Sequence, residues 1–167
     1  GRSLEEATGA RLSEKGWRAG VAESCTGGLT TSRLTDVPGS SAWLDRSVVC
    51  YSNDAKQAWL GVSSPLLQEH GAVSGPVAAA MASGLRQRAG VDVAVAITGI
   101  AGPAGGSEEK PVGTVWLAID GPQGAHALGC WFPGGRRHVK AFASSAAIDL
   151  LRRYASGVAL QTDWVRR

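Results

Sequence analysis

Apolar residues recur along the chain with two spacings, one typical of helices and one typical of buried strands. After Ser74, small and apolar side chains stand at steps of three and four residues, which predicts an amphipathic helix packed closely on a sheet. The members of that stripe are Val77, Ala80, Met81, Gly84 and Leu85. Residues 93–97 form a continuous apolar run of strand length, which indicates a strand covered on both faces.

The same patterns predict the remaining elements. Helices are expected over 2–15, 28–34 and 56–60, after Ser64, and after 133–135 with Val139, Phe142, Ala143, Ala146 and Leu150 on the apolar face. Strands are expected over 17–22, over 47–51 as a buried strand, and over 112–119 and 126–132 as an antiparallel pair joined by the turn 121–124. This order predicts an α/β fold, a single-domain three-layer α/β/α sandwich with a mixed β-sheet over 1–167.

The segment 22–28, Ala-Glu-Ser-Cys-Thr-Gly-Gly, is the first candidate for chemistry because it links a predicted strand to a predicted helix. Gly27 and Gly28 lack a Cβ, so they allow positive φ and a close approach of main chain to a ligand. The amides that open the following helix are unpaired donors at a positive dipole end, which suits an anion. Ser24 is a candidate nucleophile, although capping the helix is the commoner role for Ser24 or Thr26.

A serine nucleophile needs a base, and Lys56 is the best candidate. Lys56 falls in the first turn of a predicted helix, where the dipole disfavours an ammonium, and burial would lower its pKa further. A neutral lysine can take the Ser24 proton. The alternative is a solvated lysine paired with Asp54, which is the more common arrangement.

Two further segments predict the rest of a site. The long loop over 98–111 is of a kind that is usually functional in a compact domain, and its glycines match neither the GxGxxG nor the P-loop fingerprint. Ser24 is not in a GxSxG elbow either. Arg136 and Arg137 open the last helix, where acids are ordinarily preferred, so they predict a phosphate receptor, although a plain exposed pair explains them equally well.

Composition and charge limit the kinds of cofactor, partner and location that we expect for this chain. A chain of 167 residues can bury a sufficient core without a metal or disulfide, and its three cysteines and three histidines show no ligand spacing, so no metal site and a reducing cytoplasmic location are expected. The net charge of +3 comes from scattered basic residues, which makes nucleic acid an improbable partner. No apolar stretch reaches the ~20 residues of a membrane span, so no membrane partner is expected.

Assembled in order, these segments resemble the CinA C-terminal domain, the nicotinamide-nucleotide amidohydrolase family. The resemblance covers nearly the whole chain. It is carried by residues 22–28, 35–41, 51–56, 71–74, 98–103 and 110–114. The chain departs from the family pattern at Gly135, where an acidic residue commonly precedes the arginine, and at His70, where a tyrosine is common.

The resemblance implies an enzyme that hydrolyses the carboxamide of nicotinamide mononucleotide to nicotinate mononucleotide and ammonia, in pyridine nucleotide salvage and without a cofactor. By the same resemblance, Ser24 is the nucleophile and Lys56 and Tyr51 handle its proton. The expected substrate-binding residues are Thr26, Gly27, Gly28, Thr98, Gly99, Gly102 and Arg136, the last of these for the phosphate.

A second hypothesis is a non-catalytic nucleotide- or protein-binding module with the same fold, and the intact set of Ser24, Tyr51 and Lys56 favours the enzyme. We also expect the chain to form homo-oligomers. Three questions stay open at this point: whether Lys56 or Tyr51 is the base, whether Arg136 or Arg137 holds the phosphate, and whether the chain belongs to a longer two-domain protein.

Overall fold

One mixed sheet organises the computed structural model, which describes residues 1–161. Its strands lie in the order β2-β1-β3-β4-β5, with β2, β1 and β3 parallel and β4 and β5 antiparallel to their neighbours. The strands are β1 (Ala19–Glu23), β2 (Leu44–Val49), β3 (Val93–Gly99), β4 (Thr114–Gly121) and β5 (Gly124–Trp131). The antiparallel pair is joined at Gly121 and Gly124, as the turn chemistry predicts.

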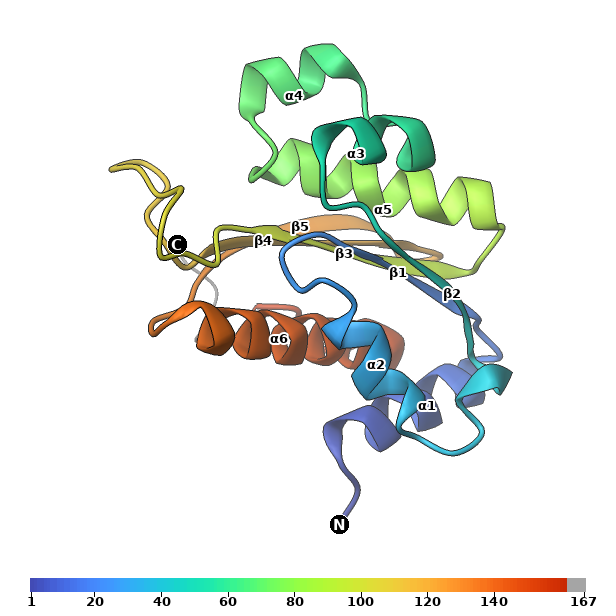
Figure 1. Ribbon diagram of the computed structural model, residues 1–167. Coiled ribbons are helices and arrows are strands. Elements are labelled where there is room, and N and C mark those ends of the chain that lie inside the picture. Colours follow the sequence, from blue (N-terminus) through green and yellow to red (C-terminus); the bar gives the residue numbers. More distant parts are fainter. Residues whose placement is uncertain (162–167) are drawn as a thin grey trace.

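Helices cover both faces of this sheet (Figure 1). On one face lie α1 (Leu4–Lys15), α2 (Leu29–Thr35) and α6 (Arg136–Ser156), and on the other lie α3 (Asn53–Leu60), α4 (Ser64–His70) and α5 (Gly75–Ala89). A short 3-10 helix, Ser40–Ala42, precedes β2. The predicted three-layer α/β/α sandwich with a mixed sheet is therefore confirmed. No helix among residues 1–161 has the length and apolar character needed to cross a membrane.

Two hydrophobic cores follow from the alternation along β3. Val93, Val95 and Ile97 belong to the core under α6, whereas Ala94 and Ala96 belong to the core under α5. Small side chains on the second face let α5 approach the sheet closely, which fits the small-residue stripe of that helix. The predicted burial of residues 93–97 on both faces is confirmed, because each is fully buried.

Two details of the sequence prediction are wrong. The second strand begins at Leu44 and ends at Val49 instead of covering 47–51, and it is not buried: as an edge strand it has one neighbour, and Val49 is 50% exposed. Phe142, expected on the apolar face of the last helix, is 47% exposed, because that helix packs through Val139, Ala143 and Ala146.

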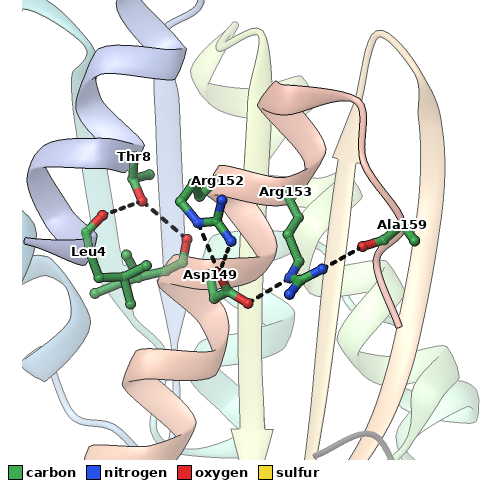
Figure 2. A network of polar contacts seen from close by, with 7 residues as sticks. Leu4, Thr8, Asp149, Arg152, Arg153 and Ala159 are labelled. Atoms are coloured by element: carbon green, nitrogen blue, oxygen red, sulfur yellow. Dashed lines mark hydrogen bonds and ion pairs between the residues drawn. The ribbon is translucent and has the colours of Figure 1, made fainter. Parts of the chain in front are cut away.

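Polar contacts join α6 to α1 and to the segment that follows α6 (Figure 2). The Thr8 hydroxyl in α1 lies 2.8 Å from the Leu4 carbonyl and 3.4 Å from the Ile148 carbonyl in α6. Asp149 accepts hydrogen bonds from Arg152 and Arg153, and Arg153 also donates to the Ala159 carbonyl.

Candidate functional site

The carboxyl ends of the three parallel strands meet at one edge of the sheet. Ser24 follows β1, and its N–H donates to the Ile97 carbonyl of β3 at 3.0 Å, while the Cys50 N–H donates to the Glu23 carbonyl at 2.8 Å. In open α/β sheets a ligand crevice forms at this edge, where the connections that follow two neighbouring strands go to opposite faces. Here β1 is followed by α2 on one face, and its neighbour β2 is followed by α3 to α5 on the other.

Lys56 is the one fully buried lysine among the described residues, with 1% of its surface exposed. Its Nζ lies 3.0 Å from Ser24 Oγ, 3.1 Å from the Cys50 carbonyl and 3.3 Å from the Tyr51 carbonyl. Asp54 makes no ion pair with it within the part of the chain that the structure describes, so the expected surface pairing is not formed. The first turn of α3 holds the lysine, and the Ser52 hydroxyl caps that turn by accepting from the Ala55 N–H.

Burial lowers the pKa of Lys56, because the protein interior penalises an ammonium; interaction with Cys50 and Cys25 opposes the change weakly. The three contacts suit either protonation state. A neutral amine donates its two N–H bonds to the two carbonyls and presents its lone pair to the Ser24 hydroxyl, whereas an ammonium donates to all three oxygens. A proton can therefore pass between Ser24 and Lys56 without any heavy atom moving.

A cavity of about 270 Å³ opens in front of this pair. It brings together most of the predicted residues, namely Ser24, Tyr51, Lys56, Thr98, Gly99, Gly102 and Arg136. Sequence reasoning missed Asn53, Ala72 and Val73, which also line it. The Thr98 hydroxyl donates to the Ala72 carbonyl at 2.9 Å, which explains how a segment distant in sequence comes to form one wall.

Arg136 stands at the mouth of the cavity. One of its Nη atoms donates to the Gly102 carbonyl at 2.7 Å and the other to the Tyr51 hydroxyl at 3.0 Å. The Tyr51 hydroxyl is thus held at the rim by the arginine, with 61% of the residue exposed, and it is the Tyr51 carbonyl that contacts Lys56. Gly135, the N-cap of α6, supplies no side-chain cap to the first amides of this helix.

The loop after β3 keeps its shape through a few specific contacts. Gly102 has a φ of 84°, and a Cβ there would lie 2.4 Å from a Val112 methyl carbon, so only glycine fits this turn. Lys110 Nζ donates to the His70 carbonyl at 2.7 Å and ties the loop to the end of α4. The loop predicted over 98–111 therefore forms one side of the cavity, as expected for the second half of a site.

Thr26, Gly27 and Gly28 are not among the residues that line the cavity. The amides that open α2 are not free for an external anion either, because Thr30 N–H and Thr31 N–H donate to the Glu23 carboxylate. The expectation of open donors at this helix is wrong: a buried acid of the chain itself occupies them. Its signal in the sequence was a carboxylate at the end of the strand that precedes the helix, since acids are favoured near a helix start.

Cys25 also lines the cavity but is a poor competitor for Ser24. Desolvation by burial, reinforced by the nearby Glu23, raises the pKa of its thiol to about 12, against weaker opposing effects that include Lys56 and Lys140. A thiol in that state carries almost no thiolate at neutral pH, and the thiolate is the nucleophilic form. The Ser24–Lys56 pair is therefore the reactive pair that the geometry offers.

A larger hollow of about 590 Å³ lies elsewhere, between the start of α1, the end of β5 and α6. It is lined mainly by apolar side chains such as Trp131 and Phe142 and contains none of the candidate residues. Among residues 1–161, no group of three or more His, Cys, Asp or Glu side chains is arranged to hold a metal ion. The smaller, more polar cavity is the one lined by the candidate reactive residues Ser24 and Lys56.

A three-layer α/β/α domain with a buried serine–lysine pair at the ends of its parallel strands is thus the class that fold and site define. The family of CinA C-terminal domains matches residues 1–155, and the chain belongs to that family.

Relatives and solved structures agree with that assignment. A CinA-like protein from Syntrophobacter fumaroxidans is 54% identical over 90% of this chain, and one from Anaeromyxobacter sp. (strain K) is 52% identical over 89%. The chain spans only 35% and 36% of the length of these two relatives.

Two solved structures have the same fold. The crystal structure of a CinA superfamily protein from Klebsiella pneumoniae has a TM-score of 0.87 at 34% identity, covering 93% of this chain and 99% of its own. That of the competence/damage inducible protein from Agrobacterium tumefaciens has a TM-score of 0.81 at 42% identity, covering 89% and 93% respectively.

Replacing Lys56 by methionine tests the energetic cost of the buried amine. Because the folded state lowers the Lys56 pKa, the unfolded chain binds more protons between that lowered pKa and the ordinary lysine value of ~10.4, so wild-type stability rises with pH across this window. Lys56→Met should flatten the rise and be at least as stable as wild type at neutral pH. Each tenfold change in the protonation equilibrium corresponds to about 1.4 kcal/mol.

The measurement is the free energy of unfolding in urea at a series of pH values. Lys15→Met, at an exposed position, is the matched control and should keep the wild-type slope. A Lys56→Met variant with the wild-type slope would show that the amine carries no burial penalty.

Proposed function

We propose that this chain is an amidohydrolase that converts nicotinamide mononucleotide to nicotinate mononucleotide and ammonia. The observation that carries the proposal is the 3.0 Å contact between Ser24 Oγ and a buried lysine amine at the wall of a cavity. A hydroxyl beside a neutral amine is an activated nucleophile, and a carboxamide is a substrate that needs both attack and protonation of its leaving group.

The chemistry proceeds in two halves. Ser24 Oγ attacks the carboxamide carbon while its proton passes to the Lys56 amine; the resulting ammonium protonates the departing nitrogen, which leaves as ammonia, and an acyl ester remains on Ser24. Lys56, neutral again, takes a proton from water, whose oxygen attacks the ester. The C–O bond to Ser24 breaks, Lys56 returns the proton to Ser24 Oγ, and the acid that is released loses its proton to solvent to give the carboxylate product.

The remaining walls supply recognition. Arg136 has donors beyond the two that contact Gly102 and Tyr51, and it is the first residue of α6, a helix start without a side-chain cap, which together suit a 5′-phosphate. The Tyr51 ring, exposed at the rim, forms a surface beside that arginine. In this proposal Lys56 handles the serine proton and Tyr51 orients Arg136, since the Tyr51 hydroxyl has the arginine as its described partner.

Ammonia release from a small panel tests the proposal: nicotinamide mononucleotide, nicotinamide riboside and nicotinamide. We expect the mononucleotide to be the best substrate. Ser24→Ala should lower kcat by roughly a thousandfold or more, as removal of a nucleophile commonly does, whereas Cys25→Ala, a similar truncation at the next residue, should retain most activity. If none of the three compounds releases ammonia, a non-catalytic binding module is favoured instead. If Cys25→Ala is inactive and Ser24→Ala is active, Cys25 and not Ser24 is the nucleophile.

Arg136→Ala tests the phosphate subsite. If its charge-assisted hydrogen bonds are worth about 1.5–3 kcal/mol, kcat/KM for the mononucleotide should fall roughly ten- to a hundredfold, with little change for the riboside, which lacks the phosphate. Arg137→Ala is the matched control, because Arg137 is exposed and does not line the cavity. Equal losses on both substrates would mean that Arg136 serves the fold or the chemistry instead.

A further inference from the structure

Glu23 is a buried acid that the proposed reaction does not use. It ends β1 and is 0% exposed, yet none of the described residues forms an ion pair with it. Oε1 accepts from the Thr26 hydroxyl at 2.7 Å and the Thr30 N–H at 2.9 Å, and Oε2 accepts from the Thr31 N–H at 3.0 Å and the Thr31 hydroxyl at 2.6 Å. Four hydrogen bonds from neutral donors therefore replace the water that a carboxylate loses on burial.

These bonds take the place of a helix cap. The N-cap of α2 is Gly28, with a φ of 101° and no side-chain cap. The first amides of a helix need acceptors, and the positive end of the dipole favours an anion there. The Glu23 carboxylate supplies both from the residue next to Ser24.

The segment 24–28 is consequently fixed at both ends. Upstream, the Glu23 carbonyl accepts from the Cys50 N–H and the Ser24 N–H donates to the Ile97 carbonyl. Downstream, the Glu23 side chain holds Thr26 and the start of α2, and the Gly27 N–H turns back to donate to the Ser24 carbonyl at 3.0 Å. Ser24, which lies inside this closed turn, has little freedom to leave Lys56.

We propose that Glu23 is a positioning residue whose buried carboxylate shapes the 24–28 turn so that Ser24 Oγ lies on Lys56 Nζ. The inference rests on the proposed function only in taking Ser24 and Lys56 as the reacting pair. Its charge has a second consequence, since Glu23 adds to the burial that keeps the Cys25 thiol protonated beside the serine.

Glu23→Gln is the sharp test because it keeps the side chain's size and removes one acceptor. A glutamine has one carbonyl oxygen and one NH₂ group, and either orientation turns the NH₂ toward a backbone N–H, of Thr30 or of Thr31. The turn must then shift. Misplacing a reacting group by about 1 Å can cost on the order of 100-fold in rate, so we expect kcat to fall roughly ten- to a hundredfold. KM should change little, because Arg136 and Tyr51 lie on other segments.

Two readouts are taken on protein shown to be folded: kcat and KM for ammonia release, and the rate at which a fluorophosphonate modifies Ser24, followed by intact mass. Both kcat and the modification rate should fall together in Glu23→Gln. Glu14→Gln makes the same chemical change at an exposed pair with Arg11 and should alter neither. Tyr154→Phe removes two part-buried hydrogen bonds, to Gln123 and Gly124, at the far end of α6, so it should lower stability and leave both rates unchanged.

A second pair of variants applies if Glu23→Gln does not fold. Thr31→Val loses only the hydroxyl donor to Oε2, and Thr31→Ser keeps it, so the valine variant should react more slowly and the serine variant at nearly the wild-type rate. Equal rates in this pair, or wild-type kcat and modification rates in Glu23→Gln, would overturn the inference.

The two proposals can fail separately. If wild-type protein releases no ammonia but its Ser24 is modified, and is modified more slowly in Glu23→Gln, the proposed substrate is refuted and the role of Glu23 is supported. If wild-type protein releases no ammonia and its Ser24 is not modified by the fluorophosphonate, both the proposed function and the role of Glu23 are overturned.

Discussion

The burial of one amine is the constraint around which this domain is built. Lys56 is almost wholly removed from water, and a buried ammonium is so unfavourable that the protein must either pair it or neutralise it. Within residues 1–161 no carboxylate pairs with it, and its hydrogen-bond partners are two carbonyls and the Ser24 hydroxyl. That choice of neighbours favours the neutral amine, and it leaves the lone pair directed at the one group whose proton it can take.

Sheet topology makes that arrangement possible. Parallel strands β1, β2 and β3 end at the same edge, so residues 24, 50–51 and 98–100 meet there although they are far apart in the chain. The starts of α2 and α6 differ in the charged groups that lie beside them. The Glu23 carboxylate accepts hydrogen bonds at the start of α2, whereas α6 begins without a side-chain cap at Arg136, which lines the cavity. The first arrangement stabilises the turn that bears Ser24, and in the proposed function the second receives the phosphate.

How much of this could be predicted varies with the physical origin of each feature. The order of elements and the two-sided burial of 93–97 follow from local periodicity and turn chemistry, and they were predicted correctly. The loop over 98–111 was expected to form half of a site, and in the structure several of its residues line the cavity. Local patterns carry no information on strand order, so they could not show that residues 44–49 form an exposed edge strand. The burial of Lys56 was the less common alternative on sequence grounds, because it depends on Cys50, Tyr51 and Ser24 converging from separate segments. The role of Glu23 was missed for a similar reason. The sequence does not show which side chain accepts hydrogen bonds from the first amides of a helix, because that acceptor is placed by the fold.

The central claim is that Lys56 is a base whose pKa burial has lowered, and its most direct test is a titration of that one amine. The chain has four lysines, Lys15, Lys56, Lys110 and Lys140, so the side-chain ¹³Cε and ¹⁵Nζ signals can be assigned with one variant for each. We expect the Lys56 signals to change over a pH range below the ordinary lysine value of ~10.4, and the pH dependence of kcat to follow the same transition, with activity rising as Lys56 loses its proton. A Lys56 that titrates at ~10.4, in an enzyme already fully active well below that pH, would contradict the account.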